Sequence, residues 1–158
     1  MTFTETDSLT ERQKRQIVVL WNEEYPEKLS FSKSEEFGQY LESVSERHHI
    51  LLIDENHIVK GWLMHFIRNN EKWFVMLLDS KLQGKKLGSK LLALAKKRTS
   101  ELNGWVIDHD NELKQNGESY RSPVGFYEKN GFSILSDIEL ELKDIHGIKV
   151  KWEKNNRS

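Results

Sequence analysis

The sequence contains no cysteine, which excludes disulfide bonds, thiolate nucleophiles and the common structural zinc sites. It also contains no apolar run near the roughly 18 residues that a helix needs to cross a bilayer. Residues 1–7 lack the basic and apolar segments of a signal peptide. From these absences we expect a soluble, cytoplasmic protein, stabilised by packing alone, with no membrane partner.

The chain also has almost no excess charge, since 24 Lys and Arg residues against 25 Asp and Glu residues give a formal net charge of −1. This balance argues against nonspecific nucleic-acid binding. One segment departs from it: residues 81–99 hold seven basic residues and no acid, so the other residues together carry −8 (−1 minus the +7 of this segment). The segment has no aromatic residues on which bases could stack, so we expect no nucleic-acid partner.

The length of 158 residues and the apolar content of 37% suit one domain with its own core, and we expect a single domain over residues 1–158. Possible capping boxes at Ser8–Glu11 and Ser32–Glu35 predict two amphipathic helices before the first strand. The aromatic residues of these helices and their connection are expected to be mostly core, with one or two lining a pocket: Trp21, Tyr25, Phe31 and Phe37.

Alternating and uniformly apolar runs predict the strands that follow. They cover residues 50–53, 58–68, 73–78, 104–109, 132–135, 138–142 and 148–152, the last one after a turn at His146-Gly147. The run 73–78 is so apolar that we expect a central strand covered on both faces. Helices are predicted over 87–102 and from Ser122-Pro123 to Asn130-Gly131. These elements indicate an α+β protein.

The segment from Leu77 to Leu92 runs from a buried strand through a glycine-containing turn into a helix. Free N–H groups at the start of a helix bind anions, and glycine lets a phosphate approach the backbone closely. Three lysines, Lys85, Lys86 and Lys90, add positive charge there. Neither G-x-x-x-x-G-K-[ST] nor G-x-G-x-x-G occurs, so the turn is not a Walker or Rossmann phosphate site.

Residues 83–88, QGKKLG, resemble the Q/R-x-x-G-x-G/A motif of the GNAT superfamily of acyl-CoA N-acyltransferases. The segment 126–132, FYEKNGF, is similar to the F-Y-x-x-x-G-F segment of the same superfamily and follows one further strand. The chain departs from the pattern at Lys86, where the family usually has glycine, and at Tyr120, where it often has asparagine.

The resemblance covers residues 50–142 as an acyl-CoA-binding core and leaves residues 1–47 as a helical region that shapes the acceptor site. It implies an α/β/α layered, mixed and mostly antiparallel twisted sheet of about six to seven strands, flanked by about four helices. The sheet would be splayed between its fourth and fifth strands. It also implies acetyl-CoA as the co-substrate and no metal.

The resemblance further assigns roles to residues. Tyr127 would be the acid that protonates the leaving thiolate, and a backbone N–H near Leu77 and Leu78 would stabilise the oxyanion. The base is open: Asp108 and His109 are candidates, as are Glu112, Glu118 and a chain of water molecules. The residues expected to bind the co-substrate are Leu77, Leu78, Gln83, Gly84, Lys85, Lys86, Leu87, Gly88, Ser89 and Tyr127.

The leading hypothesis is an acetyl-CoA-dependent N-acetyltransferase acting on a small-molecule or peptide amine. The alternative is a noncatalytic module of the same fold that binds acyl-CoA or a protein partner, which Lys86 in place of glycine suggests. The charge of −8 outside residues 81–99 slightly favours a cationic acceptor. The chain is expected to be a monomer, or a homodimer paired through its C-terminal strand. His65 is expected to lie on a strand face, and the pair His48-His49 has no carboxylate at metal-ligand spacing.

Overall fold

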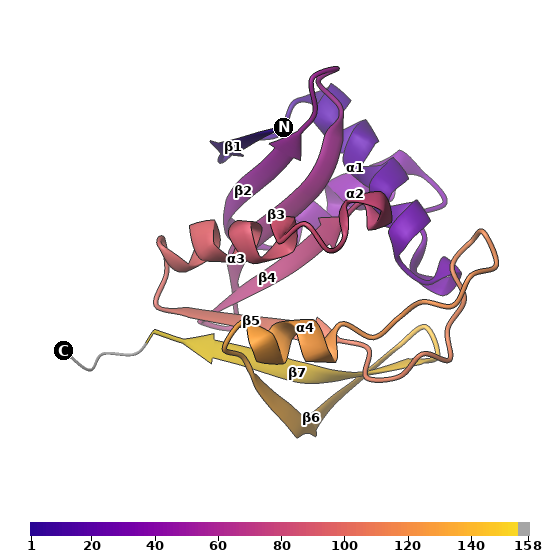
Figure 1. Cartoon of the computed structure of the whole chain (residues 1–158), viewed down its shortest axis with the longest axis vertical. Coiled ribbons are helices and arrows are strands. Elements are labelled where there is room, and N and C mark those ends of the chain that lie inside the picture. The colour runs from indigo at the N-terminus through magenta and orange to yellow at the C-terminus, as the bar shows by residue number, and fades with distance from the viewer. Residues whose placement is uncertain (155–158) are drawn as a thin grey trace.

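A computed structural model describes residues 1–154 of the chain. These residues form a seven-stranded sheet in the order β1-β2-β3-β4-β5-β7-β6, shown in Figure 1. The strands are β1 (Thr2–Thr6), β2 (Ser45–Ile53), β3 (Val59–Arg68), β4 (Glu71–Leu78), β5 (Glu101–Val106), β6 (Ser133–Leu142) and β7 (Ile145–Glu153). The helices of the described residues are α1 (Glu11–Glu24), α2 (Ser34–Glu42), α3 (Leu87–Lys96) and α4 (Val124–Lys129), with short 3-10 helices at Glu27–Leu29 and Ser80–Leu82.

Neighbouring strands are antiparallel except β4 and β5, which are parallel. The predicted α+β class, with a mixed and mostly antiparallel sheet, is therefore confirmed.

Helices cover both faces of the sheet (Figure 1). Side chains of β3 point alternately to the two faces. Trp62 and Phe66 pack in the hydrophobic cluster with residues of α1 and α2, whereas Leu63 packs in the cluster with residues of α3 and α4. This alternation follows from the two-residue period of a strand. The result is a three-layer structure with one hydrophobic cluster on each face.

The first two helices begin later than the sequence predicts. Thr10, not Ser8, caps α1: its hydroxyl accepts a hydrogen bond from the Gln13 N–H (3.1 Å), and the Gln13 side chain accepts one from the Thr10 N–H (2.9 Å). At α2, Glu36 rather than Glu35 accepts hydrogen bonds from the residues before the helix. The predicted capping box is therefore present at α1 in a different register, whereas at α2 the N-cap is Lys33, whose side chain makes no capping hydrogen bond, and the box predicted at Ser32–Glu35 is wrong.

Two boundaries at the sheet were also predicted wrongly. The expectation that two helices precede the first strand misses β1, which pairs with β2 at the edge of the sheet. The predicted helix 87–102 ends at Lys96, and Leu102 is a fully buried residue of β5. The strand β5 begins at Glu101 and ends at Val106, before the last three residues of the predicted strand 104–109.

The last two strands form a hairpin whose turn is Lys143-Asp144, not His146-Gly147. Both turn residues have a positive φ, 50° and 64°. The two predicted strands 132–135 and 138–142 are one irregular strand, β6, with a register shift between Leu135 and Glu139. The edges of the sheet are β1 and β6, so β7 is an internal strand. The expectation that the C-terminal strand offers a free edge for a second subunit is therefore wrong.

Candidate active site

The sheet opens between β4 and β5. These two strands share one backbone pairing, Trp73 with Asn103, and separate beyond it. The predicted covering of β4 on both faces is thus only partly correct, since Val75, Met76 and Leu78 are half-buried beside the gap. The gap confirms the splay that the resemblance implied between the fourth and fifth strands.

Three hydrogen bonds show which backbone groups of β4 face the gap. The side chain of Asn103, on β5, donates to the Lys72 carbonyl (3.0 Å), and the Tyr25 hydroxyl donates to the Met76 carbonyl (3.4 Å). On the opposite side, the Asp79 N–H donates to the Lys60 carbonyl at the start of β3 (2.9 Å).

Backbone groups alternate in direction along a strand, so even-numbered residues of β4 turn their N–H and C=O towards β5. Met76 and Leu78 therefore present backbone donors to the gap, whereas Leu77 presents its own to β3. Of the two residues predicted near the oxyanion, Leu78 has the suitable orientation.

A cavity of about 1380 Å³ includes this gap and reaches both faces of the sheet. On the α3 side it is lined by residues of the glycine-containing turn and by Phe126 and Tyr127. On the α1 side its lining is largely aromatic. Of the four aromatic residues predicted as mostly core, three line it (Trp21, Tyr25 and Phe31), while Phe37 is fully buried in the core.

The start of α3 meets the cavity with unpaired backbone donors. Lys90 is the first residue of the helix whose N–H bonds back, to the Lys86 carbonyl (3.2 Å), so the N–H groups of residues 87–89 lack helical partners. The first turn contains no acid and the N-cap has no side-chain hydrogen bond. Gly84 has a φ of +83° with open space where a Cβ would lie. This set of donors fits a phosphate group.

Lys86 occupies the N-cap of α3 in the left-handed conformation, with φ 63° and ψ 16°. It therefore adopts the backbone geometry that the glycine of the family motif adopts at no steric cost. Its side chain is exposed. Gly88 is buried two residues later, and a Cβ there would lie 3.0 Å from the Phe126 ring. The absence of a side chain at Gly88 thus lets α3 approach α4.

The family model for the acetyltransferase (GNAT) domain matches residues 45–134, which is more than half of the chain. The chain belongs to the GNAT acetyltransferase family. The motifs at residues 83–88 and 126–132 and the splayed sheet agree with this family membership.

Solved structures are similar to this GNAT chain over nearly their whole length. They include an aminoglycoside 6'-N-acetyltransferase complexed with coenzyme A (TM-score 0.74, 18% identity, 100% of this chain and 99% of that chain) and one from Enterococcus faecium (0.72, 18%, 100% and 99%). A GNAT phosphinothricin acetyltransferase from Sinorhizobium meliloti in complex with AcCoA is also similar (0.67, 14%, 100% and 91%). A search of curated protein sequences found no significant match. At these identities the likeness shows the fold alone.

Tyr127 of the GNAT chain lines the cavity from α4. The side chain is only 6% exposed, and its ring lies 5.7 Å from that of Phe74 and 5.2 Å from that of Phe132. Burial raises the pKa of Tyr127 well above its usual value, so the hydroxyl stays protonated at neutral pH. A buried, protonated hydroxyl on the cavity lining is available to donate a hydrogen bond.

Two more tyrosines extend this group. Tyr120 and Tyr25 both line the cavity, and their ring centroids are 6.3 Å apart. Burial raises the pKa of both hydroxyls. Tyr120, noted in the sequence only as a departure from the family pattern, therefore adds a second phenol to the site.

The structure does not bring most of the predicted base candidates to the cavity. Because β5 ends at Val106, Asp108 is exposed in the following loop, and the His109 side chain accepts a hydrogen bond from the Asn111 N–H (3.2 Å). Glu112 does not line the cavity and forms an ion pair with Lys28, which does not line it either. Among these four candidates, Glu118 lines the cavity.

Sequence reasoning missed Glu24, the carboxylate at the end of α1. Its side chain is 11% exposed and pairs with Lys114, which is 13% exposed, at 3.1 Å. Its other oxygen accepts a hydrogen bond from the Ser80 N–H (3.0 Å). Glu24 thus ties α1 to the loops on both sides of the gap. The sequence contained one signal for Glu24: it is an acid in the last turn of a predicted helix, where a negative charge opposes the helix dipole.

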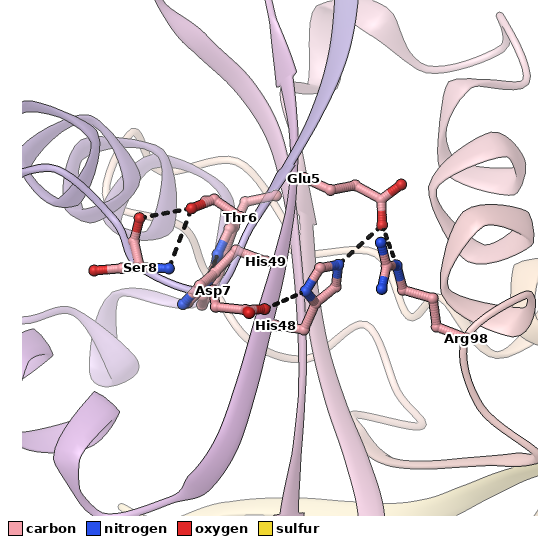
Figure 2. A network of polar contacts seen from close by, with 8 residues as sticks. Glu5, Thr6, Asp7, Ser8, His48, His49 and Arg98 are labelled. Atoms are coloured by element: carbon pink, nitrogen blue, oxygen red, sulfur yellow. Dashed lines mark hydrogen bonds and ion pairs between the residues drawn. The ribbon is translucent and has the colours of Figure 1, made fainter.

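The histidines lie away from the cavity. Figure 2 shows His48 between two carboxylates, with Nδ1 2.6 Å from Asp7 and Nε2 2.9 Å from Glu5, while Arg98 donates to Glu5 (2.6 Å). His65 is buried on β3, its ring 5.1 Å from that of His48, and burial lowers the pKa of His65 to about 4. This network joins β1 to β2 and to the end of α3. No cluster of residues within 1–154 has the composition of a metal site.

No helix in residues 1–154 is long and apolar enough to cross a membrane.

Proposed function

We propose that this GNAT chain is an acetyl-CoA-dependent N-acetyltransferase that moves the acetyl group to an amine by direct attack. The observation that carries the proposal is the cavity that includes the β4–β5 gap. It joins the free N–H groups of α3, the gap-facing backbone of β4 and the Tyr127 hydroxyl in one space. The coenzyme A and AcCoA named for two similar structures support acetyl-CoA as the donor.

Binding of the donor would use the turn and the gap together. The diphosphate would accept hydrogen bonds from the N–H groups of residues 87–89 at the positive end of the α3 dipole. The exposed lysines of the turn, Lys85 and Lys86, would add positive charge. The pantetheine arm would lie beside β4, where Met76 and Leu78 offer backbone hydrogen bonds. The thioester would then lie close to Tyr127.

The transfer itself needs three groups. The amine nitrogen forms a bond to the thioester carbon, and the oxygen gains negative charge that the Leu78 N–H would stabilise. The carbon–sulfur bond then breaks, and the Tyr127 hydroxyl would give its proton to the sulfur. The amine proton leaves to a base. Of the candidates, Glu118 is favoured by its place on the lining, and Asp108 and His109 remain predictions without that support.

The noncatalytic alternative rested on Lys86. Lys86 takes a left-handed conformation that glycine reaches at no steric cost, and its side chain is exposed, which supports a turn that still accepts a phosphate. We therefore favour the enzyme.

Three measurements test the proposed function. Millimolar coenzyme A should raise the melting temperature, since a ligand at a hundredfold excess over Kd stabilises by about 2.7 kcal/mol. Acetyl-CoA with a panel of amines should release free thiol. Tyr127→Phe should lower turnover on the order of 10²-fold and leave coenzyme A affinity nearly unchanged, because the ring still packs.

Absence of any shift with coenzyme A would show that the turn is not a diphosphate site. Turnover of Tyr127→Phe within a few-fold of the parent would show that the tyrosine only packs.

A further inference from the structure

Arg68 lines the cavity on its α1 side, and within residues 1–154 it has no acidic partner. It is the last residue of β3, and its guanidinium carbon lies 5.5 Å from the centre of the Phe66 ring and 5.0 Å from that of Trp73. Among residues 1–154 no carboxylate or carbonyl pairs with this guanidinium, although the side chain lines the cavity. The nearest acid in the hairpin, Glu71, pairs instead with Lys149 at 3.4 Å.

The aromatic contacts hold Arg68 in place without neutralising it. A guanidinium over an aromatic face gains cation–π attraction and keeps its N–H donors free. These donors form a planar fork that matches a carboxylate. Arg68 is therefore positioned to bind an anionic group of whatever occupies the cavity.

Apolar side chains on one face of β4 and β5 lie between Arg68 and the gap. Trp73 stacks on Trp105 with ring centroids 5.3 Å apart, and Val75 follows on the same face of β4. Trp73, under the guanidinium, and Leu78, whose N–H is assigned to the oxyanion, are five residues apart, about 17 Å along a strand. A substrate that reaches both ends must therefore carry its anion and its amine several bonds apart, with an apolar spacer between them.

The charges of the cavity lining agree with an anionic ligand. Of the described residues, two acids line the cavity, Glu24 and Glu118, and Glu24 is already paired with Lys114. Six basic residues of the same part of the chain line it: Arg68, Lys86, Lys114, Arg121, Lys129 and Lys143. Lys86 belongs to the turn proposed for the diphosphate and Lys114 pairs with Glu24, which leaves Arg68, Arg121, Lys129 and Lys143 for a second anion. The slight preference for a cationic acceptor, suggested by the charge of the whole chain, does not extend to this cavity.

We propose that the acceptor is an ω-amino acid or a short peptide, whose anionic group binds Arg68 while its distant amine reaches the β4–β5 gap. This inference rests on the proposed function and names the substrate class of the same site. It excludes α-amino acids acetylated at their α-amine, because their carboxylate and amine share one carbon. It also excludes polyamines as preferred acceptors.

Binding of matched ligands tests the inference without requiring turnover. The probes are 6-acetamidohexanoate and its neutral counterpart N-hexylacetamide, titrated against the full chain with coenzyme A present and followed by tryptophan fluorescence. The anion should bind about tenfold more tightly, the effect of a charge-assisted hydrogen bond. Arg68→Met should remove this preference and leave N-hexylacetamide binding unchanged, and Arg68→Lys should keep part of it.

Lys72→Met is the matched control, since Lys72 lies on the same hairpin, on the opposite face, outside the cavity lining. It should keep the full preference. Equal binding of the two probes, or equal loss in Arg68→Met and Lys72→Met, would overturn the inference. In a second arm, 6-aminohexanoate should be acetylated faster than hexylamine or 1,6-diaminohexane. If Arg68-dependent binding is found but no amine is acetylated, the inference stands as a binding site and the proposed function fails.

Discussion

Replacing Lys86 by glycine should stabilise the protein. Lys86 has a φ of 63°, in the left-handed region that costs an L-residue about 1–2 kcal/mol. Glycine adopts this conformation without that cost, but it also makes the unfolded chain more flexible. We therefore expect Lys86→Gly to raise the free energy of unfolding by about 1 kcal/mol, or the melting temperature by about 2–4 °C for a chain of this size.

The neighbouring lysine supplies a matched control. Lys85 is also exposed and lies in the same turn, but its φ is not positive. Lys85→Gly removes the same charge and adds the same flexibility, so it should lower the free energy of unfolding by about 0.5 kcal/mol. Urea unfolding without ligand measures both variants. Stabilisation of the two to the same extent would refute the strain argument, because charge removal alone would then explain it.

Substitutions of Lys86 also test how the turn binds coenzyme A. Lys86→Ala and Lys86→Gly remove the same charge, and only the glycine variant removes the Cβ. If the lysine side chain contacts the diphosphate, both variants should bind coenzyme A more weakly and to the same degree. Tighter binding by Lys86→Gly than by Lys86→Ala would instead show that the Cβ restricts the approach of the phosphate.

Three further outcomes follow from the contacts. Gly104→Ala should destabilise by about 1–3 kcal/mol in urea unfolding, since its Cβ would lie 2.7 Å from a buried phenylalanine ring; an unchanged midpoint would contradict this packing. Lys114→Met should cost about 3 kcal/mol because it leaves the carboxylate of Glu24 without its ion pair, and the added Glu24→Gln change should restore part of the loss. The hydrogen bond from His48 lowers the pKa of Glu5 below 4.5, so its stabilisation is present above that pH and is lost as the pH falls through the lowered pKa. The stability difference between the parent and His48→Gln should therefore shrink in acid, and a difference that grows there would refute the assignment.

The elements predicted correctly are those with strong periodicity, and the errors have physical causes. β1 carries one large apolar residue, Phe3, because an edge strand buries little, so no alternation indicated it. Leu102 falls in phase with the leucines of α3, and periodicity alone could not assign it to a strand. The turn at Lys143-Asp144 needs positive φ values at both residues, and although aspartate adopts such values fairly often, lysine rarely does.

Within the candidate site, too, the residues that follow one another in the sequence could be predicted and those from distant elements could not. The turn proposed to bind the diphosphate is contiguous in the sequence, so a local motif could predict it. Glu24 and Arg68 come from other elements, and no local pattern showed that the fold brings them to the same cavity. Asp108 and His109 were placed at the gap because β5 was predicted to extend to residue 109, and its end at Val106 moves them to a loop.

Because β4 and β5 share a single backbone pairing, a small rotation at this pairing would displace the far end of the gap by a much larger amount. Strands β1–β4 and β5–β7 meet at the backbone bridge of Trp73 and Asn103. Leu78 is five residues beyond this pivot, about 17 Å, so a rotation of about 5° there would move the far end of the gap by about 1.5 Å. A misplacement of 1 Å is enough to slow a reaction about 10²-fold. The Trp73–Trp105 stack and the Lys149–Glu71 ion pair lie beside this pivot, so residues distant from Leu78 would set the width of the gap in which the thioester is proposed to react.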